Sequence, residues 1–184
     1  MNLTIQDVER LQQNLQEEQH DYQIELQEGN ILVMRPSDIE SSEIGAELIR
    51  LLGNWIKPRQ LGRIFDSSGG FIMPNSDLRA PDVSFVAAAR LKRTVRDFAE
   101  LVPDLVVEIK SKTDKISKLE EKVKLFLELG ARVGILINPD ELTVSVYRPD
   151  GEVEVLAGED KLTIVELFPG WEVTISELWP PVFE

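Results

Sequence analysis

Three charged residues stand in two stretches of the chain that are otherwise mostly apolar. Asp82 follows Pro81 in the run PDVSFV, and Glu108 and Lys110 lie two residues apart in the run DLVVEIK. If both runs form strands, Glu108 and Lys110 project from the same side, with their positions roughly 6.6 Å apart. Both side chains could then reach the same bound ion or water.

Carboxylates at the ends of adjoining strands can supply hard oxygen ligands to Mg²⁺ or Mn²⁺. A lysine beside them can orient a metal-bound water or stabilise charge on an attacked phosphate, as in metal-assisted phosphodiester hydrolysis. A structural explanation is also open, in which Glu108 and Lys110 form an ion pair on the solvated face of an edge strand and Asp82 caps a strand end. Spacing alone favours this second explanation.

Local patterns predict the elements that would position these residues. Because Pro81 cannot donate to a ladder, the first strand effectively begins at Asp82, with Val83 and Phe85 on one face and Asp82 on the other. Four further elements are expected downstream: a basic helical connection over residues 90–100, a strand over 105–110, an amphipathic helix over 114–130, and a buried central strand over 133–137.

Two elements upstream each contain an acidic residue of interest. Residues 22–26 and 31–34 predict a β-hairpin around Glu28-Gly29-Asn30, in which Gly and Asn can take positive φ and Glu25 is a solvent-side strand residue. A long helix is expected from a cap at Ser37 to about residue 57, where Pro58 stops it. Glu40 lies in the first turn of that helix, where the helix dipole alone explains an acidic residue.

Length and composition bound the possibilities. A chain of 184 residues fits one domain over residues 1–184, with an N-terminal helix in residues 1–20 and the core in residues 21–184. The chain has no cysteine, which excludes a disulfide framework and thiol catalysis. It starts without the pattern of a signal peptide, and no apolar run approaches the length of a membrane span. We therefore expect a soluble, cytoplasmic protein with no membrane partner.

The net charge of −13 argues against a protein that coats nucleic acid through a general positive field. The basic residues are unevenly distributed, because ten of the 20 fall between Arg90 and Lys124, against seven acidic ones. This basic segment, residues 90–124, is the candidate contact for DNA. A solvated helix face with alternating charges explains residues 115–124 equally well.

The chain resembles the Uma2 family of predicted endonucleases, within the PD-(D/E)xK nuclease superfamily. Pro81-Asp82 followed by Glu108-Ile109-Lys110 looks like the superfamily signature. Family segments are matched in order from about residue 20 to residue 180 by IELQEGNILVM, GRIFDSSGGFIMPN, RAPDVSFV, PDLVVEIKSKTD, LEEKVKLFLELGARVGILINP and VSVYRP. The resemblance implies a restriction-endonuclease-like fold, which is a mixed α/β arrangement of one mixed sheet flanked by helices. It also implies a Mg²⁺-dependent nuclease site and a homodimer.

The resemblance also assigns roles to individual residues. Asp82 and Glu108 correspond to metal ligands, and Lys110 corresponds to the residue that positions the water. Glu40 falls where many members have a His and related members an acidic residue, so Glu40 is the first candidate for an extra ligand. Glu25 is the second candidate, because it matches the acidic residue of the family's Tyr-Glu-Leu strand, although Ile24 replaces the Tyr here.

We therefore predict a metal-dependent endodeoxyribonuclease that uses Asp82, Glu108 and Lys110 with Mg²⁺ or Mn²⁺. Two alternatives stay open. The acidic surface is compatible with a non-catalytic relative that binds nucleic acid or protein, and the same chemistry would serve a phosphatase acting on small phosphate esters. No groove-reading motif is present, so the sequence predicts no recognition site on DNA.

Overall fold

A computed structural model describes residues 3–18, 22–34 and 36–183. Its largest element is a six-stranded sheet with the strand order β10-β9-β8-β7-β6-β3. β7 and β8 are parallel and the other pairs are antiparallel. The strands are β3 (Gly62–Asp66), β6 (Val83–Ala87), β7 (Leu105–Ile109), β8 (Val133–Asn138), β9 (Thr143–Tyr147) and β10 (Val153–Ala157).

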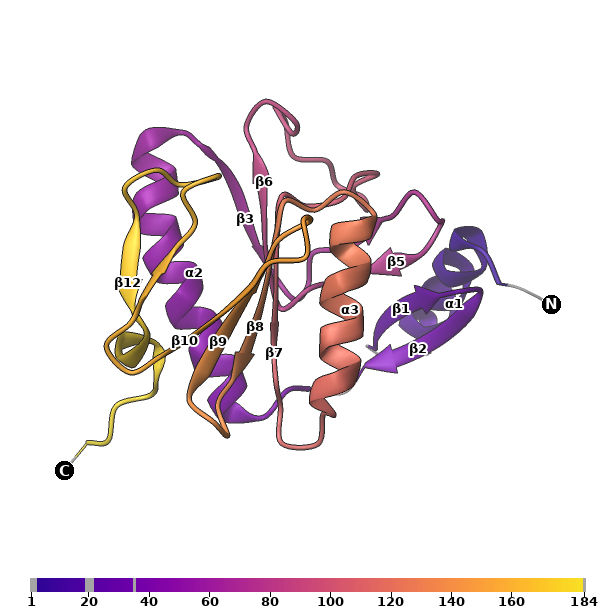
Figure 1. Ribbon diagram of the computed structural model, residues 1–184. Helices are drawn as coiled ribbons and strands as arrows, with labels where there is room; N and C mark the ends of the chain where they lie inside the picture. The colour runs from indigo at the N-terminus through magenta and orange to yellow at the C-terminus, as the bar shows by residue number, and fades with distance from the viewer. Residues whose placement is uncertain (1–2, 19–21, 35, 184) are drawn as a thin grey trace.

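One face of this sheet is covered by helix α2 (Ile39–Arg59). Its apolar stripe recurs every three or four residues, as expected for a helix packed on a sheet, and Ile44, Leu48 and Leu52 are fully buried in one cluster with Val83 and Phe85. The small hairpin of β11 (Lys161–Thr163) and β12 (Glu172–Thr174), with the 3₁₀ helix η1 (Ile175–Leu178), completes this side (Figure 1).

The opposite face is covered by helix α3 (Ile116–Glu128), which connects the parallel strands β7 and β8 (Figure 1). Val123 and Phe126 are buried against the sheet. Gly134 of β8 allows the close approach of the helix, since a Cβ at this position would lie 2.5 Å from Cγ1 of Val123. This contact sets how closely the side chains of α3 approach the strands.

A second sheet has the order β2-β1-β5-β4 and lies beyond α3 (Figure 1). It consists of β1 (Gln23–Gln27), β2 (Asn30–Met34), β4 (Phe71–Ile72) and β5 (Leu78–Arg79). Helix α1 (Ile5–Glu17) packs Val8 onto Ile24 and Leu26 on one face of this sheet. Thr4 and Asp7 form a capping box at the start of α1.

Most local predictions for strands and helices are confirmed, with differences at their ends. The prediction of Ser37 as the cap of α2 is wrong, because Asp38 accepts a hydrogen bond from the backbone N–H of Ser41 at 2.9 Å. Pro58 lies inside the last turn instead of ending the helix. In the β1–β2 turn, positive φ occurs at Glu28 and Gly29, as in a type I′ turn, and not at Asn30. Residues 1–2 and 19–20 of the predicted N-terminal segment lie outside the described residues.

The prediction of a helical connection over residues 90–100 is wrong. This segment consists of turns and bends, and it is tied to the second sheet at its end. Ala99 accepts a hydrogen bond from the N–H of Ile72 at 2.9 Å and donates to the carbonyl of Gly70 at 3.1 Å. These non-local backbone bonds compete with the local bonds that a helix would need.

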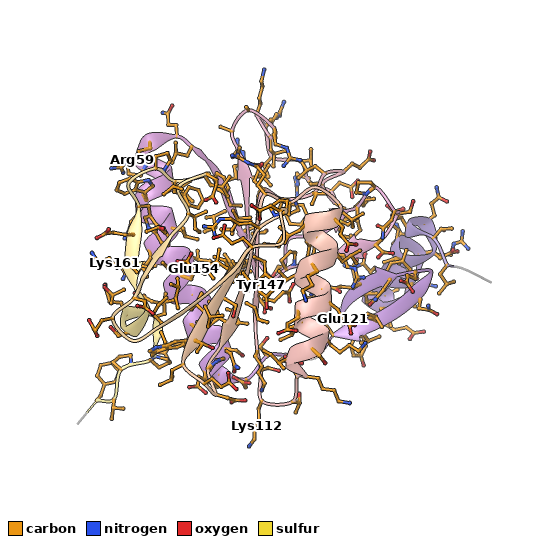
Figure 2. All side chains as sticks on the ribbon, viewed as in Figure 1. Arg59, Lys112, Glu121, Tyr147, Glu154 and Lys161 are labelled. Carbon is orange, nitrogen blue, oxygen red and sulfur yellow. The ribbon has the colours of Figure 1, made fainter. Side chains whose placement is uncertain are left out.

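The fold also divides the basic segment of residues 90–124. The connection after β6, with Lys92, Arg93 and Arg96, lies at one end of the six-stranded sheet, and the loop after β7, with Lys112, lies at the opposite end (Figures 1 and 2). The segment is therefore not one continuous basic surface. Within the described ranges, no helix is both long and apolar enough to cross a membrane.

Candidate active site

Asp82 stands immediately before β6, at the end of the sheet where β7 ends. The antiparallel register pairs Val83 with Val107, so Asp82 lies opposite Glu108. Oδ2 of Asp82 accepts a hydrogen bond from the backbone N–H of Ile109 at 2.8 Å, which holds the carboxylate against the end of β7. Burial raises the pKa of Asp82 above its ordinary value. The two acidic residues of the signature are therefore neighbours across the ladder.

Glu108 lies on the face of β7 that is covered by α3, and only 2% of it is exposed. Burial is the main cause that raises the pKa of Glu108 to about 8. The nearby carboxylates of Asp82 and Glu25 raise it further, and the ammonium of Lys122 opposes them. Proton uptake by Glu108 is thus favoured unless a cation compensates its charge.

Lys122 of α3 supplies a cation between two buried carboxylates. Its Nζ lies 3.0 Å from Oε1 of Glu108 and 3.3 Å from Oε1 of Glu25. Although burial works against its charge, the carboxylates of Glu108 and Glu25 raise the pKa of Lys122. Lys122 therefore stays protonated and joins a residue of the six-stranded sheet to a residue of the second sheet.

Glu25 of β1 is only 2% exposed, so the prediction that it faces solvent is wrong. The second sheet lies beside α3, and Lys122 of that helix contacts the Glu25 carboxylate (Figure 1). The Glu25 carboxylate accepts a hydrogen bond from the N–H of Ala80 at 3.0 Å and lies 3.5 Å from the guanidinium of Arg79. Arg79 also pairs with Asp77 at 3.1 Å. This charged network fixes Glu25 next to Lys122 and Glu108.

Lys110 is directed to a different partner. β7 ends at Ile109, and Nζ of Lys110 lies 2.6 Å from Oδ2 of Asp140, in the turn after β8, and 3.2 Å from the carbonyl of Ser111. As far as the described part of the chain goes, its ammonium has no ion pair with Asp82 or Glu108. The structure thus brings Asp82 and Glu108 together and leaves Lys110 at the edge of the site.

Glu40 lies in the first turn of α2 and is exposed. Among the residues that the structure describes, its carboxylate has no ion-pair partner. Asp38, which lies two residues before Glu40, is instead hydrogen-bonded to the loop that follows β7, at the end of the sheet where Asp82 and Glu108 lie. Oδ2 of Asp38 accepts a hydrogen bond from the backbone N–H of Lys112 at 2.7 Å, in the loop that follows β7. Figure 2 shows Lys112 at this end of the molecule.

Sequence reasoning missed the part played by Lys122, which it grouped with the solvated lysines of residues 115–124. A signal was present, because Lys122 follows Leu119 by three residues and precedes Phe126 by four, and both of these lie on the inward stripe of α3. Arg79 had no comparable signal, since its burial depends on strands that come from distant parts of the chain.

The acidic residues can be compared with what a divalent cation requires. No three of the acidic or histidine side chains in the described ranges gather closely enough to enclose a metal ion by themselves. Mg²⁺, however, is usually held by one or two carboxylates and keeps several waters. Asp82 and Glu108 form such a pair, and Oε1 of Glu108 makes no well-directed hydrogen bond although Lys122 lies beside it. This donor set fits a hard cation that competes with the Lys122 ammonium.

Comparisons with known proteins show the family and the fold of the chain. Residues 5–176 match the family described as "Uma2: Putative restriction endonuclease". The crystal structure of a "putative nuclease belonging to DUF820" from Anabaena variabilis ATCC 29413 is similar, with a TM-score of 0.77 and 26% identity over 84% of this chain and 88% of that chain. No curated protein matches. The fold is restriction-endonuclease-like, and the chain belongs to the Uma2 family.

Proposed function

We propose that this protein is a Mg²⁺-dependent endonuclease that hydrolyses phosphodiester bonds of DNA through Asp82, Glu108 and Lys110. The observation that carries the proposal is the pairing of Asp82 with Glu108 across the β6–β7 ladder, in a chain of a nuclease family. Oxygen ligands of this kind suit Mg²⁺ or Mn²⁺. The proposed nuclease is one domain over residues 1–184 and acts as a cytoplasmic homodimer.

Each residue has a proposed part in the reaction. Asp82 and Glu108 hold the metal ion, which when bound polarises the phosphate and makes a coordinated water more nucleophilic. Lys110 orients the attacking water once its flexible side chain turns away from Asp140. Lys122 stays protonated and stabilises the charge that develops on the phosphate oxygens. Its ion pairs with Glu108 and Glu25 support this role, since they hold the ammonium at the site.

Two acidic residues are candidates for an additional ligand. Glu25 is favoured over Glu40 because Glu25 shares Lys122 with Glu108, whereas Glu40 is exposed and unpaired within the described residues. Contact with the phosphate backbone of DNA is assigned to exposed lysines at the same end of the sheet, Lys112 and Lys115, and not to the basic connection at the opposite end.

DNA cleavage by the purified protein tests the proposal. We expect cleavage with Mg²⁺ or Mn²⁺, none with EDTA, and a loss of at least ~100-fold in rate for Asp82→Asn, Glu108→Gln and Lys110→Ala. Lys92→Ala is the control for Lys110→Ala, because it removes an exposed ammonium from the connection at the opposite end of the sheet. Full cleavage by Lys110→Ala would contradict the role of Lys110, and full cleavage by Asp82→Asn would contradict the site.

Titration calorimetry with Mg²⁺ separates this proposal from the non-catalytic alternative. The ammonium of Lys122 already pairs with Glu108 and Glu25, and this observation favours a protein that binds a partner without a metal. Heat of Mg²⁺ binding that disappears in Asp82→Asn supports the nuclease. No binding of Mg²⁺, together with affinity for DNA in EDTA, would support the alternative. Turnover of small phosphate esters without cleavage of DNA would instead indicate a phosphatase.

A further inference from the structure

β2 is an edge strand that contains no charged residue, although the protein as a whole is strongly acidic. Within the described residues it pairs with β1 on one side and has no strand on the other. Its sequence is NILVM, and Leu32, Val33 and Met34 are 37%, 56% and 38% exposed. An exposed apolar edge strand is a ready template for pairing with another strand.

The other long sheet edges are protected against such pairing. β10 contains Glu154, which lies 3.6 Å from Arg148 and is labelled in Figure 2, and β3 contains Arg63 and Asp66. Charged residues on an edge strand disfavour association through that edge. Among the five-residue edge strands that the structure describes, β2 is the one that contains no charged residue.

The backbone of β2 has a self-complementary pattern. Gln27 and Asn30 flank the two-residue turn and form the first hydrogen-bonded pair of the hairpin. Because hydrogen-bonded pairs alternate along an antiparallel ladder, Leu32 and Met34 also bond to β1. The alternation directs the N–H and C=O groups of Ile31 and Val33 away from β1. An antiparallel copy of β2 can bond to these groups when Ile31 faces Val33 of the copy.

We propose that β2 pairs with β2 of a second copy of this chain, antiparallel and about a twofold axis at Leu32. Such a contact is isologous, because the same strand contributes to both sides. The lack of charge on β2 supports this partner, because the repulsion between two chains of net charge −13 is largely screened beyond about 8 Å at physiological salt and the two strands in contact add no like charges. Leu32 then packs against Leu32 of the copy, and the two sheets become one.

The pairing has a consequence for the active site, and this consequence rests on the proposed function. Glu25 lies directly opposite Leu32 in the register. The row across the joined sheet is therefore Glu25, Leu32, Leu32 and Glu25, so the two Glu25 Cα atoms lie three strand spacings apart, roughly 14 Å. A twofold axis in an antiparallel pair is perpendicular to the sheet, so both Glu25 side chains and the sites beside them lie on the same face of the joined sheet.

The size of the contact predicts its strength. One pair of five-residue strands is smaller than the roughly 800 Å² per partner that is typical of stable complexes. We therefore expect a dimer that dissociates in the micromolar range, roughly 1–100 µM. Light scattering as a function of concentration should give masses that approach twice the chain mass of 20.9 kDa.

Cross-linking through single cysteines tests the register, because the chain has no cysteine of its own. Leu32→Cys places two thiols on the axis, within the Cα separation of about 4.4–6.8 Å that a disulfide requires. Val33→Cys is the matched control, since its copy is displaced by two residues and lies beyond the reach of about 7 Å. Val155→Cys, on the edge strand β10, measures random collision.

We expect Leu32→Cys to form covalent dimers at least ~10-fold faster than either control, because pairing raises the effective concentration of the two thiols. Val33→Pro removes an outward N–H that β1 does not use and should give a monomer with unchanged circular dichroism, whereas Val33→Thr, which keeps the N–H, should still dimerise. Equal rates for the three cysteine variants, or a monomeric wild type at ~100 µM, would overturn the proposal.

These measurements need neither metal nor substrate, so they are independent of the nuclease proposal. A monomeric protein that cleaves DNA would contradict the β2 contact and the homodimer, and would leave the proposed chemistry standing. A dimer of the expected register that does not cleave would contradict only the proposed activity. A wild type that stays monomeric and takes up a strand from another protein would also count against pairing with a second copy.

Discussion

The substitution Glu108→Gln removes the charge of a buried carboxyl group and keeps its volume. Glu108 is 2% exposed, and its surroundings, chiefly its burial, raise its pKa from the ordinary value of 4.5 to about 8. In the unfolded chain the carboxyl group titrates at its ordinary value. Between these two pKa values, the folded protein therefore holds a proton at Glu108 that the unfolded chain has lost.

Because the native state binds more protons in this window, the free energy of unfolding of the wild type falls as the pH rises from 4.5 to 8. The slope is at most about 1.36 kcal/mol per pH unit, which sets an upper limit of about 5 kcal/mol over the whole shift. Glu108→Gln carries no titrating group here. Its stability relative to the wild type should therefore increase by about 2–5 kcal/mol across the window, because only the wild type loses stability as its folded state releases this proton.

Urea unfolding of both proteins at several pH values between 5 and 9 measures this difference directly. Glu154→Gln is the control, because Glu154 is an exposed carboxylate on β10 (Figure 2). Its difference from the wild type should stay constant with pH. A constant difference for Glu108→Gln as well would refute the reasoning, because it would mean that the pKa of Glu108 is the same in the folded and unfolded chains.

Three further substitutions test the supports of the site. Lys122→Met should destabilise the protein by about 3 kcal/mol at pH 8, because it leaves two buried carboxylates without their cation. The loss should be smaller at pH 6, where a proton can neutralise one of these carboxylates, and urea melts at both pH values measure the difference. Gly134→Ala should cost about 1–3 kcal/mol, because the new methyl group would press on Val123, and a melt as stable as the wild type would contradict that contact. Asp38→Ala should cost about 1–2 kcal/mol through loss of the α2 cap, whereas Ser37→Ala should change the thermal midpoint little.

Features that depend on neighbouring residues could be predicted from the sequence. The alternation of Val83 and Phe85 against Val86 correctly separated the two faces of β6, which lie in different apolar clusters. The apolar run over residues 133–137 was correctly predicted as a buried central strand. The position of Asp82 at the start of a strand followed from Pro81. In each case the prediction depends on a few neighbouring residues, namely on the alternation of apolar side chains or on an adjacent proline.

Features that depend on distant contacts could not be predicted in the same way. Residues 90–100 have helical composition, but they form turns and bends, and Ala99 bonds to the backbone of Gly70 and Ile72. Glu25 alternates with apolar residues like a solvent-side residue, but Lys122 of α3, Arg79 and the backbone of Ala80 surround its carboxylate. Its bond to Lys122 joins positions 97 residues apart.

The sequence by itself determined the order of the strands along the chain, the faces of the strands, and the placement of Asp82 and Glu108 at strand ends. Only the tertiary structure decided which charges meet there. It turned Lys110 toward Asp140 and brought Lys122 and Glu25 to Glu108. The physical reason is that side-chain direction follows from local backbone geometry, whereas the pairing of buried charges depends on how two sheets and a helix pack together.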